Sequence, residues 1–348
     1  MSEPEAREGA LVTGTSEEGR SRIYWVHGGE KLWVLSPEVF VEQGWKYEDV
    51  VTLPDAELEA IPTSDQVVGE HLQYAARDDA RRRIAEPFLS GVGIELGAGL
   101  YPHILPDGAK AELFELRDPG EVAALFRTDE SAVPDFRALE AIRERFPDGA
   151  DFLIAHNVLE HCADPISTLL EWAGYVRDEG ILVLSVPCAD YCPDKGRLIP
   201  GIDHVLLDFL LARGADAFES REHAYSCTMG WMNTWEDWLP LDKVEVAQRA
   251  HEKAHMRDLE VHWHAFDPEL FDHVVQVAAR FSDRPLHPVA WSDPYLQSSE
   301  ASVGDVIGVL RVGGEARATD VGFRRRSVDR AVEAVERSLE RALAKLRT

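Results

Sequence analysis

The stretch GVGIELGAG (91–99) decides how the rest of this chain is interpreted. Its apolar residues predict a buried strand, and the glycines at its end predict a tight turn in which the backbone can approach a ligand closely. Glu95, Gly97 and Gly99 are therefore candidate binding residues. Glu115 follows Gly97 by 18 positions, at the end of the next predicted strand. An acidic residue at that place is suited to bind ribose hydroxyls.

The glycine pattern argues against a ligand that contains a pyrophosphate. A dinucleotide fingerprint GxGxxG that begins at Gly97 needs its third glycine at position 102, and this residue is Pro102. A nucleoside ligand without a pyrophosphate fits the sequence better.

Predicted strands and helices alternate outward from this stretch. Further strands are predicted for AELFEL (111–116), DFLIAHNVL (151–159), ILVLSVP (181–187) and DVIGVLRV (305–312). Helices are predicted for 64–90, most of 118–147, DPISTLLEWAGYVR (164–177) and FDPELFDHVVQVAARF (266–281). Strands separated by helices are typical of right-handed βαβ units. The sequence thus predicts an α/β fold with three layers around a mostly parallel sheet.

The residues before this domain differ from it in composition and in predicted secondary structure. Residues 1–20 are rich in Glu, Gly and Ser and predict a flexible tail. Residues 21–62 predict a small α+β module, with a hairpin over 23–35 and a short helix over 36–44. Its tryptophans form either the core of this module or an aromatic surface for sugars or a partner: Trp25, Trp33 and Trp45.

The last segment, 326–348, predicts an amphipathic helix. Its apolar residues are spaced by four and three alternately, which is the pattern of a coiled-coil seam: Val328, Val332, Val335, Leu339, Ala342 and Leu346. Two interpretations are equally favoured. The helix either packs on its own domain or pairs with a second copy to make a homodimer.

Composition restricts the partners and the compartment. The net charge is −27, so nucleic acid and anionic lipid surfaces would be repelled. The N-terminus does not resemble a signal peptide, and no apolar run is long enough to span a membrane. The four cysteines form no CxxC pair, which favours a reduced compartment. The sequence therefore predicts a cytoplasmic protein that binds neither nucleic acid nor membranes.

Three segments in order carry a resemblance to a known family: GIELGAG (93–99), DFLIAHNVLEHCADP (151–165) and DEGILVLSVP (178–187). Together they resemble motifs of the class I S-adenosylmethionine-dependent methyltransferases. The resemblance implies a Rossmann-like methyltransferase domain with S-adenosylmethionine as cofactor. Tyr101 stands where the family has the last glycine of its first motif, and the family's third strand is hard to find between 118 and 147.

A narrower resemblance extends over roughly 64–312. It rests on IELGAGLYPHILP (94–106), DKGRLIPGIDHVLLDF (194–209) and EVHWHAFDPELF (260–271). These stretches resemble a bacterial subgroup whose members often accompany glycan-assembly enzymes, which implies a sugar or glycan acceptor. Residues 21–62 resemble a small module found beside catalytic domains in bacterial proteins, which implies an accessory role.

The resemblance also implies which residues hold the cofactor. Glu95, Gly97 and Gly99 should cradle its amino-acid end, and Glu115 should bind its ribose hydroxyls. Near the methylthio group the resemblance places Asn157 and Val158.

The acceptor side is predicted from the histidines. A hydroxyl nucleophile is helped by a general base, and histidine suits that role near neutral pH. His161 and His204 are the predicted catalytic residues, and the Trp- and His-rich segment 191–265 is the predicted acceptor-binding segment. His262 and His264 are further candidates that could share one face of a strand, but no HExxH or CxxC accompanies them, and no metal is predicted.

Two classes of function remain open. One is an enzyme that methylates a hydroxyl of a small molecule or a glycan. The other is a binding or scaffold protein with an inactive methyltransferase-like domain. Because Glu95 and Glu115 are both present, the sequence favours the enzyme.

Overall fold

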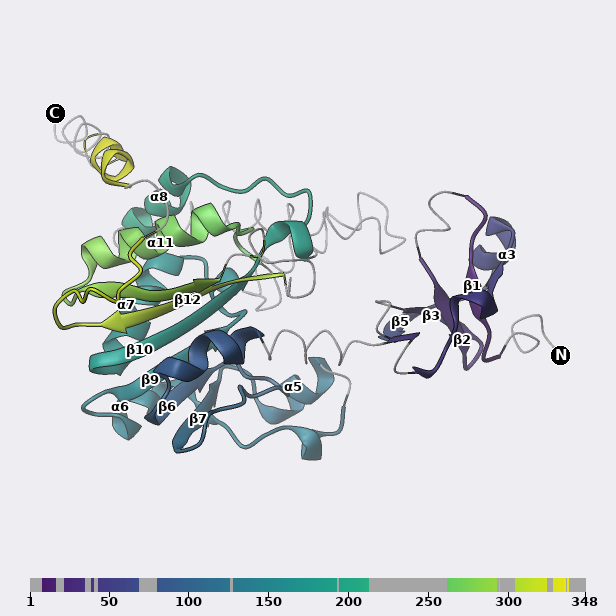
Figure 1. Cartoon of the computed structure of the whole chain (residues 1–348), viewed down its shortest axis with the longest axis horizontal. Helices are drawn as coiled ribbons and strands as arrows, with labels where there is room; N and C mark the ends of the chain where they lie inside the picture. Colours follow the sequence, from purple (N-terminus) through teal and green to yellow (C-terminus); the bar gives the residue numbers. More distant parts are fainter. Residues whose placement is uncertain are drawn as a thin grey trace. The chain divides into compact units, whose positions relative to one another are not determined.

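The structure is a computed structural model that divides into two compact units, 1–77 and 78–348 (Figure 1). The residues that it describes are 8–16, 22–34, 39–40, 43–68, 80–125, 128–192, 194–212, 262–292, 294, 304–323, 328–335 and 337. None of the helices in these ranges is long and apolar enough to cross a membrane.

The smaller unit contains a five-stranded sheet in the order β4-β1-β2-β3-β5. Its elements are β1 (Leu11–Thr13), β2 (Tyr24–His27), β3 (Glu30–Val34), η2 (Tyr47–Asp49), β4 (Val50–Thr52), α3 (Asp55–Glu59) and β5 (Thr63–Val68). The hairpin expected over 23–35 is present as β2 and β3, which pair in antiparallel fashion up to His27 and Glu30. Trp25 lies partly buried against the cluster of Leu11, Val34, Val39 and Phe40, and so does Trp45.

The tail expected over 1–20 needs a correction, because β1 lies within it. Leu11 and Val12 are buried, and β1 pairs with both β2 and β4. A three-residue strand gives almost no periodicity, so only its distant partners reveal it. The module therefore extends beyond 21–62 on both sides, through β1 and β5.

The larger unit is built on a seven-stranded sheet in the order β11-β12-β10-β9-β6-β7-β8. The strands are β6 (Gly91–Leu96), β7 (Ala109–Glu115), β8 (Arg137–Ala138), β9 (Ala150–His156), β10 (Val176–Pro187), β11 (Leu286–Ser292) and β12 (Asp305–Val312). The strands from β8 to β10 are parallel, and β12 is antiparallel to both of its neighbours. The predicted Rossmann-like α/β class with a mostly parallel sheet is confirmed.

The strand order locates a binding edge. Numbered from β6 along the chain, the order is 3-2-1-4-5-7-6, and its first five members follow the doubly wound Rossmann arrangement. The chain builds the sheet outward from β6 to one side through β7 and β8, and then to the other side through β9 and β10. In such sheets ligands bind at this switch point, outside the carboxyl ends of the strands.

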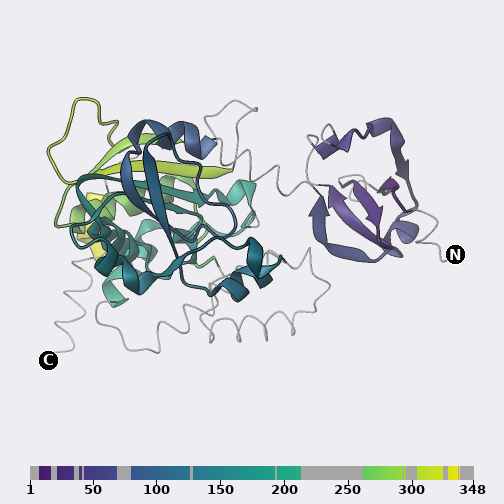
Figure 2. The ribbon, with the colours of Figure 1, turned by 90° about the horizontal axis from the view of Figure 1, so that it is seen from below.

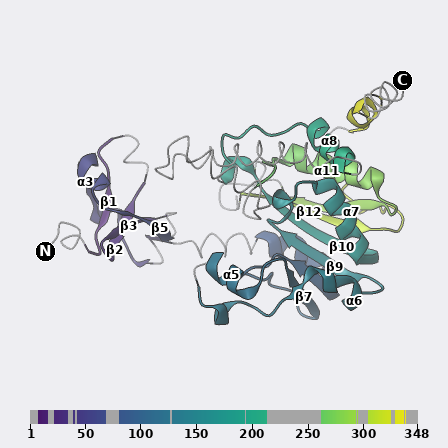
Figure 3. The same cartoon turned by 180° about the vertical axis from the view of Figure 1, so that it is seen from behind.

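Helices cover both faces of this sheet. The longer helices are α5 (Pro119–Leu125), α6 (Ile142–Arg145), α7 (Pro165–Tyr175), α8 (Ile202–Ala212) and α11 (Pro268–Phe281). Single 3-10 turns are η3 (Glu86–Phe88), η4 (Glu130–Ala132), η5 (Leu139–Ala141), η6 (Leu159–His161) and η7 (Ala189–Tyr191). Ala85 and Leu89 pack on Phe152, Ile154 and Val183. The segment 80–89 therefore covers one face of the sheet (Figure 2). The helices α7, α8 and α11 contact one another and cover the other face (Figure 3).

Two of the expected helices are present in part. Residues 118–147 are largely helical as expected, but they are divided into α5, α6 and two 3-10 turns, with the two-residue strand β8 among them. Residues 64–68 belong to β5 instead of a helix, residues 80–88 are helical, and residues 69–79 lie outside the described residues. The strand β11 was not predicted, and it lies at the edge of the sheet, where a proline such as Pro288 is tolerated.

Three of the six apolar residues of the C-terminal seam pack in the core of the larger unit. Residues 329–335 are helical, and Val328, Val332 and Val335 are buried in the same core as α11. The amide of Val328 also donates to Oε1 of Gln276 on α11, at 3.3 Å. The remaining seam residues lie outside the described residues, so the predicted homodimer stays a prediction: Leu339, Ala342 and Leu346.

Val332→Ala should lower the free energy of unfolding by about 2 kcal/mol, because two buried methyl groups are lost and a cavity is left. Denaturant unfolding of the full chain measures this change. Arg330→Ala, at an exposed position of the same helix, should change it by less than about 0.5 kcal/mol. A loss that disappears at low protein concentration would show that the seam is buried by a second copy.

Candidate functional site

The loop after β6 carries the two predicted glycines in backbone conformations that favour glycine. Gly97 has φ 63° and Gly99 has φ 53°. A Cβ atom on Gly97 would lie 2.8 Å from Cγ2 of Val158, which follows β9. The turn after β6 and the residues that follow β9 therefore meet at the switch point.

Glu95 holds this loop. Its carboxylate is buried, and its two oxygens accept the backbone N–H of His103 at 2.8 and 3.1 Å. The contact closes the segment between Gly97 and His103 over the end of β6. Glu95 therefore fixes the conformation of the loop after β6 through His103.

Glu115 ends β7, the neighbour of β6, at the same edge of the sheet. Only 8% of its surface is exposed. Its Oε1 accepts the backbone N–H of Leu116 at 2.9 Å and that of Arg117 at 3.5 Å. These bonds hold the carboxylate at the strand end, where it was predicted to bind ribose hydroxyls.

A buried polar network, which the sequence did not reveal, connects the loops after β6 and β9 with β10. Nε2 of His156 lies 3.2 Å from Nδ1 of His103, and Nδ1 of His156 lies 2.9 Å from Oγ of Ser185. Asn157, which has φ 54°, donates its backbone N–H to the carbonyl of Ser185. Burial lowers the pKa of His103 to about 4 and that of His156 well below its usual range, so both rings are neutral.

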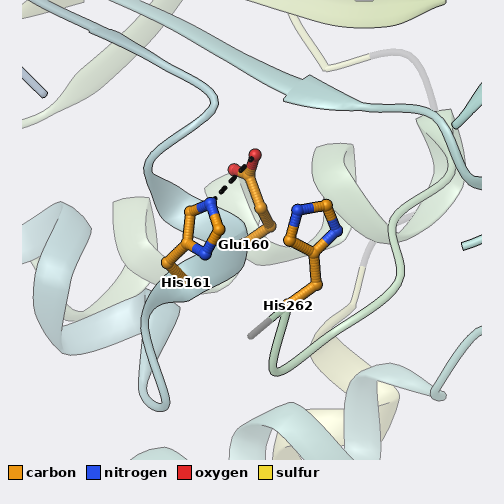
Figure 4. A group of neighbouring side chains, drawn as sticks. All are labelled: Glu160, His161 and His262. Carbon is orange, nitrogen blue, oxygen red and sulfur yellow. Dashed lines mark ion pairs between the residues drawn. The ribbon is translucent and has the colours of Figure 1, made fainter. Parts of the chain in front are cut away.

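His161 lies in a group with Glu160 and His262 (Figure 4). One ligand atom from each of the three side chains lies within 4.8 Å of the other two. Nε2 of His161 is 3.9 Å from Oε1 of Glu160, and the two imidazole rings pack edge to face at 4.8 Å. Burial raises the pKa of Glu160 to about 7, partly opposed by the charge of His262.

His262 is oriented by a buried ion pair. Its Nδ1 lies 2.7 Å from Oδ2 of Asp194, and Oδ1 of Asp194 accepts from Nη1 of Arg197 at 2.6 Å. Burial alone would lower the pKa of His262, but the hydrogen bond and charge of Asp194, with the charge of Glu160, raise it. Asp194 and Arg197 were not singled out from the sequence, although they stand three apart in the stretch DKGR (194–197).

His204 belongs to a second group, with Asp208 and His264. Nε2 of His204 is 3.5 Å from Oδ2 of Asp208, and Nε2 of His264 is 3.1 Å from the same oxygen. The His204 side chain is 42% exposed, whereas that of His264 is buried. The structure thus places the two predicted bases in two separate His-carboxylate groups. Of the predicted acceptor segment 191–265, residues 193 and 213–261 lie outside the described residues.

A cavity of about 460 Å³ opens at the other edge of the sheet. It lies near the amino ends of β9 and β10 and is lined by Asp151, Arg177, Glu179, Arg311 and Arg317. Ion pairs among these side chains already satisfy their charges. Ligands of open α/β sheets bind at the carboxyl edge, so we assign the candidate site to the switch point between β6 and β9.

The larger unit is therefore a Rossmann-like α/β domain with Gly97, Glu115 and Val158 at the carboxyl edge of its sheet. No protein-family model matches the chain, and no curated protein matches it.

Solved structures with a similar fold have several activities. The N-methyltransferase NodS from Bradyrhizobium japonicum WM9 is 12% identical, with a TM-score of 0.31, and the match covers 71% of this chain and 100% of NodS. The CurJ carbon methyltransferase is 13% identical with a TM-score of 0.33, and the match covers 67% of this chain but only 51% of that one. A Rhodobacter sphaeroides protein described as a zinc-dependent alcohol dehydrogenase is 13% identical with a TM-score of 0.38, over 67% and 87% of the two chains. The activity has to be argued from the site.

Proposed function

We propose that this protein is an S-adenosylmethionine-dependent methyltransferase that transfers a methyl group to a hydroxyl of a small molecule or a sugar. The observation that carries the proposal is the close approach of Gly97 and Val158 at the switch point of a Rossmann-like sheet, with Glu115 at the end of the neighbouring strand β7. Each residue comes from a different strand end, and each matches a motif of the resembled family.

The residues present fit this cofactor. The missing Cβ of Gly97 lets the loop after β6 lie close to Val158, and the positive φ of Gly97 gives this loop a tight turn that a ligand could approach. Glu115 offers a carboxylate for two ribose hydroxyls. Gly99 would line the same loop, and Glu95 would act through His103. Pro102 removes the third glycine of a pyrophosphate cradle. When bound, the cofactor would supply an electrophilic methyl group, so the protein needs mainly to align the acceptor and exclude water.

The acceptor is proposed to bind beyond Asn157 and Val158. His161 follows Val158 by three residues, and the group that holds His204 is connected to the same region through the segment 262–264. Imidazole-carboxylate pairs of this kind can take up the proton of a hydroxyl. A sugar or glycan acceptor is proposed because of the subgroup that the sequence resembles.

Replacing Glu115 by alanine is expected to weaken binding of S-adenosylhomocysteine by at least about 100-fold, because hydrogen bonds between ribose hydroxyls and a charged carboxylate are lost. Calorimetric titration of the purified full chain measures this affinity, with Glu115→Gln as a conservative variant.

Glu112→Ala is the matched control, since Glu112 lies on the same strand but pairs with Arg137 and Arg145. It should leave the affinity unchanged. If the unaltered protein binds neither S-adenosylmethionine nor S-adenosylhomocysteine at millimolar concentration, the proposed enzyme is wrong and a scaffold role gains weight. If it binds, transfer of a labelled methyl group to sugars and other hydroxyl compounds tests the acceptor class.

A further inference from the structure

We propose that Glu160, His161 and His262 form a binding site for one divalent transition-metal cation. No metal was predicted from the sequence. The added claim that the cation would bind hydroxyl oxygens of the acceptor rests on the proposed function, whereas metal binding itself does not.

The first support is the geometry of the group. Its members come from two distant segments, η6 and the stretch at 262–264, which are joined by a backbone hydrogen bond from Trp263 N–H to the Glu160 carbonyl at 2.8 Å. Figure 4 shows the Glu160 carboxylate and the two imidazole rings turned toward a common centre. The ligand atoms lie within 4.8 Å of one another, close enough to converge on one ion after small side-chain rotations. Two histidines and one carboxylate are a recurrent ligand set for zinc and other divalent transition metals.

The second support is the state of Glu160. Its side chain is 1% exposed, and among the described residues neither carboxylate oxygen accepts a hydrogen bond. A buried carboxyl group without hydrogen-bond donors is costly, because desolvation is not offset. A cation bound between Glu160 and the histidines would satisfy both oxygens and offset that cost.

The third support is the contact behind His262. Metal-binding histidines usually donate their second ring N–H to a carboxylate, which sets the tautomer and aims the other nitrogen at the metal. Asp194 takes this place at 2.7 Å from Nδ1 of His262, and Arg197 holds Asp194 from the other side. With Nδ1 used in this way, Nε2 of His262 is the ring nitrogen that would bind the cation. Arg197 also donates to the carbonyl of His262 at 3.0 Å, so the whole segment is held in place.

The location gives the cation a role. Glu160 follows Val158 by two residues, and Val158 contacts the loop proposed to cradle the cofactor. Three protein ligands leave positions open on a zinc-like ion, which is the arrangement of catalytic rather than structural sites. A hydroxyl oxygen bound at an open position would be held beside the cofactor edge and would have a lowered pKa. On an ion with five or six ligands, acceptors with two neighbouring hydroxyls, such as sugars or catechols, could occupy two such positions.

The test uses the purified full chain, stripped with a chelator and titrated with Zn²⁺, Mn²⁺ or Mg²⁺ by calorimetry, and with Co²⁺ by visible absorption. One equivalent per chain and a Co²⁺ spectrum typical of histidine ligands are expected. Glu160→Gln and His262→Ala should each weaken Zn²⁺ binding by at least about 100-fold. Asp194→Asn should weaken it by about 10- to 100-fold. Circular dichroism checks that each variant is folded, and the Co²⁺ spectrum of the unaltered protein does not depend on any variant.

Two results would overturn the proposal. One is a Co²⁺ spectrum that does not differ from that of the ion in water. The other is metal binding that survives in Glu160→Gln and His262→Ala but is lost in His204→Gln, which would place the ion in the second group. Binding of S-adenosylhomocysteine is measured in the same samples. If it persists while metal binding fails, only the metal site is wrong; if metal binds and the cofactor does not, only the proposed function is wrong.

Discussion

Replacing Asp305 by alanine is expected to lower the free energy of unfolding of the larger unit by about 3–5 kcal/mol, the largest stability effect that we expect from one substitution. Asp305 begins β12 and is completely buried. Its Oδ2 accepts from Nη2 of Arg81 at 2.6 Å and from Nε at 3.0 Å, and the Arg81 side chain is only 8% exposed. Without the aspartate, a guanidinium would remain buried with a large part of its charge uncompensated.

Urea denaturation of the full chain, followed by circular dichroism, measures this change. The exposed pair Arg337–Glu333 supplies the control, and Glu333→Ala should change the free energy of unfolding by less than about 0.5 kcal/mol. In a double-mutant cycle, Arg81→Ala added to Asp305→Ala should recover part of the lost stability, since it removes the guanidinium that Asp305→Ala leaves uncompensated. Additive effects of the two substitutions would mean that the pair does not act as a unit.

Replacing Gly97 by alanine should weaken S-adenosylhomocysteine binding by about 10- to 100-fold, or about 1.4–2.7 kcal/mol. The new Cβ would lie 2.8 Å from Cγ2 of Val158, so the loop or the valine must shift. The residue would also be held at φ 63°, which L-amino acids adopt at a cost of about 1–2 kcal/mol. The shift moves the backbone where we propose that it approaches the ligand, and calorimetric titration measures the result.

Gly108→Ala is the control that separates the collision with Val158 from the backbone strain of a positive φ. Gly108 has φ 88° but open space around the position of a Cβ, so its replacement carries the backbone strain without the collision. It should cost stability and leave ligand affinity unchanged. Val158→Ala added to Gly97→Ala should recover part of the lost affinity by removing the colliding methyl group. Equal loss of affinity in the Gly97 and Gly108 variants would contradict the close approach.

The central strands of the larger unit are predictable because each is a buried parallel strand with a continuous apolar run. The runs ending at Leu96, His156 and Pro187 are such strands, and burial on both faces leaves little choice of residue type. The strands β1 and β8 are different, since two or three residues carry too little pattern to be recognised. They form because a longer neighbour supplies their hydrogen-bond partners.

The candidate site also contains some features that are predictable from the sequence and others that are not. The sequence by itself determined the glycine turn after β6 and the acid at the end of β7, because backbone freedom and strand-end position are local properties of Gly97 and Glu115. Only the tertiary structure decided that His262 lies beside Glu160, about one hundred residues away along the chain, and that Asp194 orients it. The physical reason is that a ligand group depends on distances between side chains. Such distances are set by packing and by contacts such as Trp263 N–H to the Glu160 carbonyl, which no local pattern encodes.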